Sequence, residues 1–200
     1  MKHLLIGVAT LVCSAPLTSH AIPPEWCVRI FVDEQDDYVP ESMGSGTLIS
    51  PSLVVTNNHV VELAKKSDKS VTVMFPDWTI AKSAKVVATS VSKDLAIIRI
   101  AKTKRKALPL GVDPRAGDKA TLHGYGFGIY AKGEGLVTGT VYIPDVGEMD
   151  RLADMPARFG DSGGPIVANN TLIGVTSRTD GEATYFLVQS EVRKLLAKVK

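Results

Sequence analysis

A serine framed by glycines is the strongest chemical signal in this sequence. Ser162 lies within residues 160–165, which read GDSGGP. A serine hydroxyl is a weak nucleophile until a base removes its proton and hydrogen-bond donors stabilise the oxyanion that forms. Glycine adopts backbone angles closed to other residues, so the amides of Gly160 and Ser162 can point at one spot. We expect Ser162 to be a nucleophile and these two amides to form an oxyanion hole. The alternative is a chance glycine-rich turn.

A histidine is the expected base, and the sequence has four. His3 and His20 fall in a predicted leader. His59 follows an apolar run and the polar residues of a short turn, so we expect a strand to hold it facing a cleft. His123 alternates within a strand pattern, which is typical of a surface histidine or of one satisfied in the core. The sequence therefore favours His59 as the base.

The third member of such a group is a carboxylate that orients the imidazole and stabilises its charged form. Asp94 directly precedes the apolar run 95–100 and is well placed for partial burial. Alone, it would be interpreted as an ordinary turn residue. The order His59, Asp94, Ser162 puts two members in the first half of the chain and one in the second. The predicted site then lies between two lobes, where clefts commonly form.

The elements that must position these residues are short strands separated by Gly, Pro, Asp and Ser. The predicted strands are 27–32, 46–49, 53–56, 71–75, 84–89, 95–100, 119–124, 135–143, 165–168, 171–177 and 184–188. A brief helical turn is expected at 60–65, and a C-terminal helix at 190–200 with Ser190 as its N-cap. This pattern predicts an all-β protein of two packed barrels with a short C-terminal helix.

Composition narrows the class of protein without naming a function. The 200 residues are 44% hydrophobic and 22% charged, with a formal net charge of +2, which is ordinary for a globular protein. That charge is too small to indicate nucleic acid or an anionic membrane as a partner. The basic run 102–106 has no interleaved aromatic residues and is expected to be a solvated connecting loop. No metal-ligand cluster or phosphate-binding loop is visible in the sequence, so we expect neither a metal nor a cofactor.

The N-terminus predicts export. A positively charged end precedes an apolar run over 4–12, and small residues at Ser19 and Ala21 mark a cleavage site. The apolar run is too short to span a membrane. The alternative is a buried first helix. We expect residues 1–21 to be a signal peptide, and the protein to be periplasmic or secreted. Cys27 is then the one cysteine of the mature chain, expected as a small buried side chain.

Three motifs resemble those of trypsin-like, chymotrypsin-fold serine peptidases. The segments TNNHVV at 56–61 and KDLA at 93–96 are most similar to the bacterial HtrA branch, and GDSGGP at 160–165 to the wider superfamily. The closing segment 186–190 also resembles that branch. The resemblance implies two six-stranded antiparallel barrels, about 22–107 and 108–200, within one peptidase domain over 22–200. It implies a serine endopeptidase that forms an acyl-enzyme on protein or peptide substrates.

The sequence departs from that branch in two ways. HtrA-type proteins usually carry PDZ domains after the protease domain, whereas this sequence ends with its predicted helix. Asp161 stands where the branch normally has Asn. In the digestive enzymes of the superfamily the matching Asp pairs with a freed N-terminal amine, so the resemblance raises a pair between Asp161 and the amine of Ile22. Pro23 and Pro24 restrict that approach.

Specificity is inferred from the resemblance alone. The family position at the base of the primary pocket is Pro156, so we expect no preference for Lys or Arg. The pocket wall would include Ser177 and Arg178, with Ser177 and its neighbours pairing with substrate backbone as an added strand. Arg178 either favours acidic side chains or points to solvent. The alternative function is a catalytically silent fold that binds peptides or proteins. An esterase of another fold is disfavoured because the strand–helix setting of its serine motif is absent.

Overall fold

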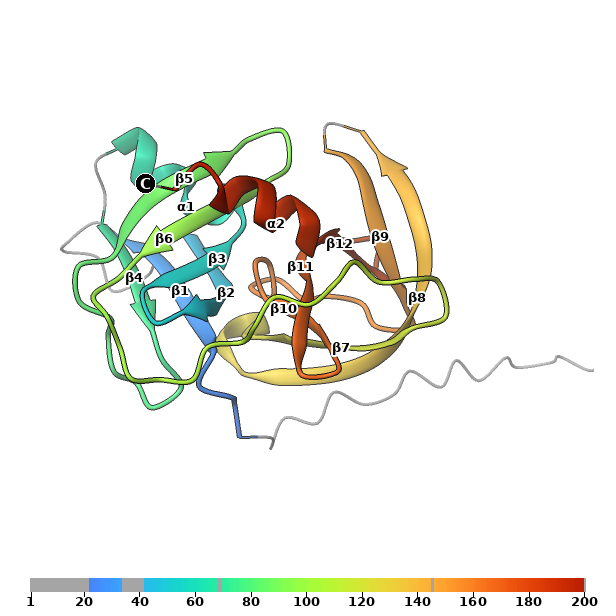
Figure 1. The fold of residues 1–200 in the computed structure, drawn as a ribbon, viewed down its shortest axis with the longest axis horizontal. Coiled ribbons are helices and arrows are strands. Elements are labelled where there is room, and N and C mark those ends of the chain that lie inside the picture. The colour runs from blue at the N-terminus through green and yellow to red at the C-terminus, as the bar shows by residue number, and fades with distance from the viewer. Residues whose placement is uncertain (1–21, 34–41, 68–69, 145, 200) are drawn as a thin grey trace, which may run out of the picture.

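Two six-stranded antiparallel sheets lie side by side in the computed structural model, which describes residues 22–33, 42–67, 70–144 and 146–199 (Figure 1). The predicted signal peptide, residues 1–21, lies outside the described residues. The structure confirms the predicted class: a mostly β protein with two six-stranded sheets and a short C-terminal helix. No helix of the described part of the chain is long and apolar enough to cross a membrane.

The first sheet carries the predicted histidine and aspartate. Its strands are β1 (Cys27–Asp33), β2 (Ser42–Ser50), β3 (Leu53–Thr56), β4 (Ser70–Met74), β5 (Lys85–Ser90) and β6 (Leu95–Arg99). They follow the order β4-β1-β2-β3-β6-β5, so β4 and β5 form the two edges and the sheet stays open between them. Helix α1 (Asn58–Ser67) contacts both edge strands. Its apolar residues Val60 and Val61 join the fully buried core of this sheet.

The second sheet closes into a barrel and carries the predicted serine. Its strands are β7 (Lys119–Gly124), β8 (Ala131–Ile143), β9 (Gly147–Ala153), β10 (Pro165–Ala168), β11 (Thr171–Thr179) and β12 (Thr184–Val188). The sequence did not predict β9, because its residues GEMDRLA lack the β-branched and aromatic side chains that mark strands. Pairing with β8 and β12 holds it in place, and the hydroxyl of Thr140 donates to its buried Asp150 carboxylate at 2.7 Å.

The C-terminal helix differs from its prediction in where it begins. Helix α2 runs over Gln189–Leu196, and Val188 occupies the N-cap position without a side-chain hydrogen bond. Ser190 is therefore not the N-cap. Its backbone N–H instead donates to Asp113 Oδ1 at 2.8 Å, from the segment that links the two sheets. An aspartate from outside the helix thus satisfies a free N–H of the first turn.

A shared apolar cluster joins the two sheets. Val55, Leu95 and Ile97 of the first sheet pack in one buried cluster with Leu172 and Val175 of the second. Helix α2 adds Val192 and Leu195 and lies across both sheets (Figure 1). Full burial of each such aliphatic side chain contributes about 2 kcal/mol. This packing fixes the ends of β3 and β6 against the loops of the barrel, where the predicted catalytic residues lie.

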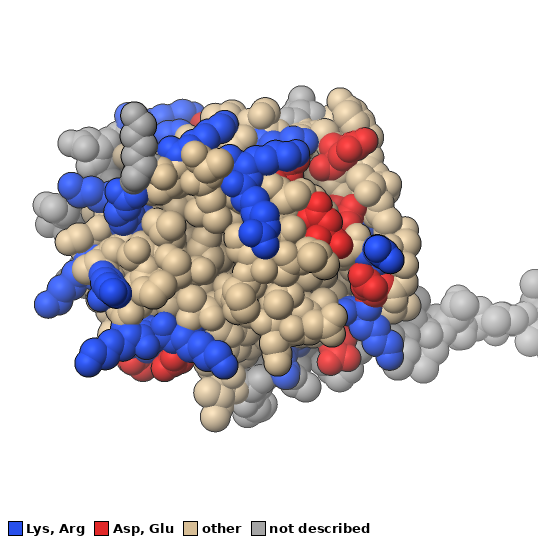
Figure 2. All heavy atoms as spheres, in the orientation of Figure 1, with Lys and Arg blue, Asp and Glu red and all other residues tan. Residues whose placement is uncertain are grey.

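The charged side chains are unevenly distributed on one face of the molecule. Figure 2 shows mostly Lys and Arg around the rim of the first sheet, and most of the visible Asp and Glu over the barrel, interspersed there with Lys and Arg. A cavity of about 190 Å³ beside α2 is lined by four carboxylates, those of Asp113, Glu148, Asp150 and Glu191, and by Lys93. Within the described ranges, no group of three His, Cys, Asp or Glu side chains is arranged to hold a metal ion.

Candidate active site

Strand pairing brings His59 and Asp94 together. Strands β3 and β6 are antiparallel, with Thr56 opposite Ala96, so the residues after β3 and before β6 lie at the same edge. His59 is the second residue of α1, and its Nδ1 lies 2.8 Å from Asp94 Oδ2. Its backbone N–H donates to Asp94 Oδ1 at 3.0 Å. The two carboxylate oxygens of Asp94 therefore both bond to His59, one to its ring and one to its backbone.

Asp94 is buried, and further polar groups fix its position. Its backbone has a left-handed φ of 45°, and the Asn57 side-chain amide donates to its carbonyl at 2.9 Å. The Ser177 hydroxyl donates to its Oδ2 at 2.8 Å. Burial raises the pKa of Asp94, but the hydrogen bonds and charge of His59, with help from Ser177, outweigh it and hold the pKa below its ordinary value. The carboxylate is thus kept ionised beside the imidazole.

The imidazole of His59 has one nitrogen left for chemistry. Nδ1 is committed to Asp94, whereas 47% of the side chain remains exposed. Nε2 is therefore the ring nitrogen available to exchange a proton with a group in the cleft. A buried carboxylate behind a partly exposed imidazole is the arrangement expected of a general base.

Ser162 lies against the segment that leads to His59. It precedes β10, is half-buried, and its carbonyl accepts a hydrogen bond from the Ser45 N–H at 2.7 Å. The next residue, Gly163, has a φ of 83°, and a Cβ there would overlap Thr56 Oγ1 and lie 3.1 Å from the Asn57 nitrogen. Only glycine admits this contact between the sheets. The Ser162 hydroxyl forms no hydrogen bond with another described residue, as is common for catalytic groups before substrate binds.

The peptide groups that carry the two predicted oxyanion N–H groups are held in place by hydrogen bonds to their carbonyls. In a trans peptide the C=O and the following N–H point in opposite directions. The Phe159 carbonyl accepts from the Phe127 N–H at 2.7 Å, and the Asp161 carbonyl accepts from the Gly164 N–H at 2.9 Å. These bonds therefore direct the N–H groups of Gly160 and Ser162 away from Phe127 and Gly164, respectively. Neither N–H donates to any residue that the structure describes, so both remain available for an oxyanion.

Asp161 has an internal partner in the uncleaved chain. Its side chain is fully buried, whereas Ile22 is 92% exposed. Its carboxylate accepts from Arg158 Nε and Nη2, both at 3.0 Å, and from the Arg158 and Gly126 backbone N–H groups at 2.8 and 2.7 Å. Four donors occupy its two oxygens. A pair with the Ile22 amine, which exists only after cleavage, stays a prediction, and that amine would have to displace Arg158 from Asp161.

The three predicted substrate-binding residues differ in their surroundings. Ser177 is skipped in the register between Thr176 and Arg178 of β11, which is a β-bulge. The bulge turns its hydroxyl inward to Asp94, a role that the sequence did not predict. Arg178 is exposed on β11, and Pro156 is half-buried in the segment before Arg158.

The other histidine and the cysteine lie away from this arrangement. His123 is buried, and its Nδ1 lies 2.8 Å from the Tyr130 hydroxyl. Burial lowers the pKa of His123 to about 4, so it is neutral near pH 7, as expected of a satisfied core histidine. Cys27 is fully buried, and burial raises the pKa of its thiol above the ordinary range. Such a thiol is inert.

Sequence reasoning missed the residues that brace the serine loop. Ser45 of β2 donates from its hydroxyl to the Gly160 carbonyl at 2.7 Å, and its own carbonyl accepts from Thr56 Oγ1 at 2.7 Å. Phe127 and Gly126 belong to the short 3₁₀ turn η1 (Gly126–Gly128), where Phe127 has a φ of 54°. The glycines of 124–128 were a visible signal of an unusual turn, but nothing local indicated what it contacts.

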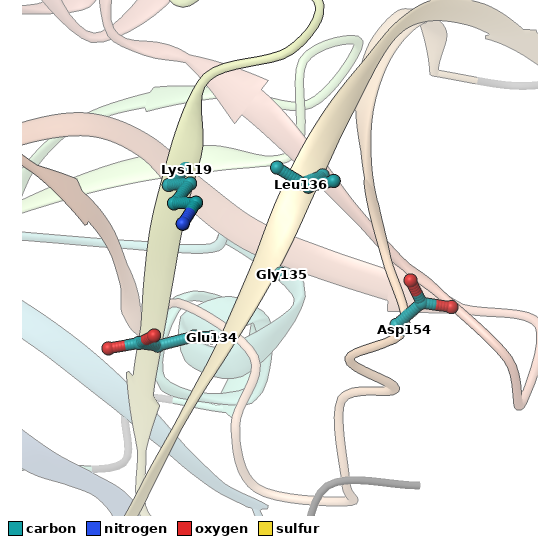
Figure 3. Close-up of a pocket in the computed structure, with 5 residues that line it drawn as sticks. All are labelled: Lys119, Glu134, Gly135, Leu136 and Asp154. Carbon is teal, nitrogen blue, oxygen red and sulfur yellow. The ribbon is translucent and has the colours of Figure 1, made fainter. Parts of the chain in front are cut away.

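A separate cavity of about 250 Å³ lies beside the start of β7 and the interior of β8. Figure 3 shows Lys119 and Glu134 on one side of β8 and the Asp154 carboxylate across it. Its lining residues include no histidine and no hydroxyl or thiol nucleophile. Asp154 belongs to this peripheral cavity, so its closeness in sequence to Pro156 does not make it part of the arrangement around Ser162.

Comparison with known proteins gives a consistent result. The family model described as "Trypsin-like peptidase domain" matches residues 44–175. A protein of Arabidopsis thaliana named as a mitochondrial protease Do-like 3 is 33% identical over 158 residues, which are 74% of this chain and 27% of that protein. The chain thus spans about a quarter of the length of this relative.

Two solved structures share the architecture. A Mycobacterium tuberculosis protease in its active form has a TM-score of 0.72 at 23% identity, covering 98% of this chain and 94% of its own. An HtrA-type protease solved with a tripeptide has a TM-score of 0.72 at 20% identity, covering 90% and 61%. Identities this low demonstrate likeness of fold.

Proposed function

The chain belongs to the trypsin-like peptidase domain family, and from this membership we propose that it is a serine endopeptidase with His59, Asp94 and Ser162 as its catalytic triad. The observation that carries the proposal is the buried Asp94 carboxylate holding a partly exposed His59 at 2.8 Å, on the edge of the first sheet that the Ser162 loop contacts. The free amides of Gly160 and Ser162 support it further.

The proposed reaction proceeds through an acyl-enzyme. Ser162 Oγ bonds to the carbonyl carbon of the scissile peptide as its proton passes to His59 Nε2. The oxyanion accepts hydrogen bonds from the N–H groups of Gly160 and Ser162. The C–N bond breaks, His59 returns the proton to the leaving amine, and an ester remains on Ser162. Water, deprotonated by His59, then attacks the ester and releases the carboxylic acid product.

We propose protein substrates cleaved after uncharged, small-to-medium side chains. Asp161, the carboxylate nearest to Ser162 in sequence, is fully buried and committed to Arg158, which leaves it no role in attracting Lys or Arg. Pro156 offers no charge. A peptide-library profile dominated by Lys or Arg at the cleavage site would contradict this preference.

Export is proposed on the leader sequence alone. Cleavage after Ala21 would begin the mature chain at Ile22. N-terminal sequencing of protein recovered from outside the cytoplasm tests this, and a first residue other than Ile22 would refute the predicted cleavage site.

Peptide-bond hydrolysis tests the proposed function. The protein is incubated with a denatured protein substrate, and new termini are identified by mass spectrometry. We expect cleavage by the wild type and a loss of about 10⁶-fold in kcat for Ser162→Ala. The matched control is Ser190→Ala, at a half-buried position of α2 whose backbone N–H donates to Asp113, and it should cleave normally. A folded wild type that binds substrate without cleaving it would indicate a silent, peptide-binding fold.

A further inference from the structure

A buried ion pair lies directly behind the serine loop. The Arg158 guanidinium meets the Asp161 carboxylate through two parallel hydrogen bonds, Nε to Oδ2 and Nη2 to Oδ1, both 3.0 Å long. The Asp161 side chain has no exposed surface, and that of Arg158 is 19% exposed. Such a carboxylate is stable only while its partner stays in place, because an uncompensated buried charge is strongly destabilising.

The surrounding backbone is shaped to admit this pair. A Cβ at Gly126 would overlap the Arg158 guanidinium, and a Cβ at Gly124 would overlap Asp161 Oδ1. The Gly126 N–H also donates to that oxygen at 2.7 Å, and Arg158 Nη2 donates to the Ile129 carbonyl at 3.3 Å. The segment 124–129 therefore forms a close-fitting wall around the ion pair.

The same wall controls the oxyanion amides. Phe127, next to Gly126, holds the Phe159 carbonyl at 2.7 Å and so directs the Gly160 N–H. Asp161 joins Gly160 to Ser162, and its side chain is fixed by Arg158. Movement of the Asp161 carboxylate would release Gly126 and, with it, the bond that sets the Gly160 amide.

We propose that Arg158 is a positioning residue, a built-in counter-ion of Asp161 that keeps the oxyanion hole formed without any freed N-terminal amine. This inference rests on the proposed function. Both oxygens of Asp161 already accept hydrogen bonds from the guanidinium, so an amine freed at Ile22 would have to displace Arg158 to reach them. Arginine suits the position better than lysine because its planar fork bonds both carboxylate oxygens at once.

The first experiment compares Arg158→Met with Arg115→Met, which removes an exposed arginine of the linking segment. We expect Arg158→Met to lower kcat about 10²-fold or more, the range measured on loss of an oxyanion donor, with KM changed less than threefold. The shape of the pH profile should stay unchanged, because the His59–Asp94 pair is untouched. Arg158→Lys should lose less, since the charge remains. Arg115→Met should match the wild type.

The second experiment separates positioning from general loss of stability. Adding Asp161→Asn to Arg158→Met removes the unpaired buried charge, and we expect kcat to recover at least tenfold over the single variant. If Arg158→Met does not fold, the folded double variant and Arg158→Lys are compared with the wild type in its place. Wild-type kcat in all of these variants would overturn the proposal.

The third experiment concerns the N-terminus. Mature protein whose N-terminal amine is acetylated, or extended by Gly-Ser before Ile22, should retain full kcat. Loss of activity on blocking the amine would overturn the inference while leaving the proposed peptidase function intact. A wild type that neither cleaves peptides nor reacts with fluorophosphonate would instead reject the proposed function itself, and with it this inference.

Discussion

The two sides of the candidate site each contain a buried aspartate paired with a basic side chain, but the pairs differ in character. On the first sheet Asp94 holds His59, whose side chain is 47% exposed. On the barrel Asp161 holds Arg158, which is 19% exposed. An imidazole can gain and lose a proton near neutral pH, whereas a guanidinium stays charged. One pair is suited to proton transfer and the other to a fixed position.

The difference indicates how the work is divided between the two sheets. The base must change its charge during each turnover, so its partner orients it and leaves one face open. The oxyanion donors must already be in place when negative charge develops, because preorganised donors need no rearrangement at that moment. On the barrel side, hydrogen bonds hold three successive residues of the serine loop. Phe127 bonds the Phe159 carbonyl, Ser45 bonds the Gly160 carbonyl, and Arg158 bonds the Asp161 carboxylate.

Among the variants that test this comparison, Asp94→Asn is expected to lower kcat the most. The asparagine favours the wrong tautomer of His59, and kcat should fall about 10⁴-fold near neutral pH. The pH profile of kcat/KM should change shape, whereas Arg158→Met changes only its height. Asp154→Asn, in the peripheral cavity, is the control. A loss below tenfold for Asp94→Asn would break the distinction between the two sides.

A smaller effect is expected for Ser177→Ala. Its hydroxyl donates to Asp94 Oδ2 at 2.8 Å inside the protein, and a hydrogen bond to a charged group contributes about 1.5–3 kcal/mol. We expect kcat to fall about 10- to 100-fold, measured on one peptide substrate with Thr179→Ala as the control. Unchanged kcat would show that His59 and Asn57 hold Asp94 without Ser177.

The smallest effect concerns stability in acid. The pKa of Asp94 is lower in the folded protein than in the unfolded chain, where it is about 3.9. The ionised carboxylate therefore stabilises the folded state above about pH 3.9, and this stabilisation is lost as pH falls through the folded pKa. The difference in unfolding free energy between wild type and Asp94→Asn should shrink as pH falls from 5 toward 2, measured by urea unfolding. A difference that grows in acid would contradict the lowered pKa.

The base side could be predicted from sequence because its signals are local. His59 and Asp94 each adjoin an apolar strand, and the pairing of those strands places both at one edge. The braces of the barrel side could not be predicted in this way. Ser45 meets the Gly160 carbonyl across 115 residues, and Gly126 meets Asp161 across 35. The first contact depends on how the two sheets pack, and the second on how the loops beside the paired strands β7 and β10 meet within the barrel, and no local pattern records either.

Prediction from sequence also failed for a polar strand and for a helix cap. Strand β9 lacks the β-branched and aromatic residues that mark strands, and its pairing with β8 and the bond from Thr140 to its Asp150 hold it in the barrel. The predicted cap Ser190 was displaced by Asp113, which reaches the helix from the linking segment. In both cases the structure depends on a hydrogen-bond partner distant in sequence, whereas the prediction used only neighbouring residues.

Reaction of the mature protein with a fluorophosphonate tests the central claim most directly, because only an activated serine beside a formed oxyanion hole attacks the phosphorus. Tandem mass spectrometry should locate one adduct on Ser162 in the wild type, with His59→Ala labelled far more slowly and Ser162→Ala not at all. A folded wild type that stays unlabelled, or an adduct on another residue, would contradict the account.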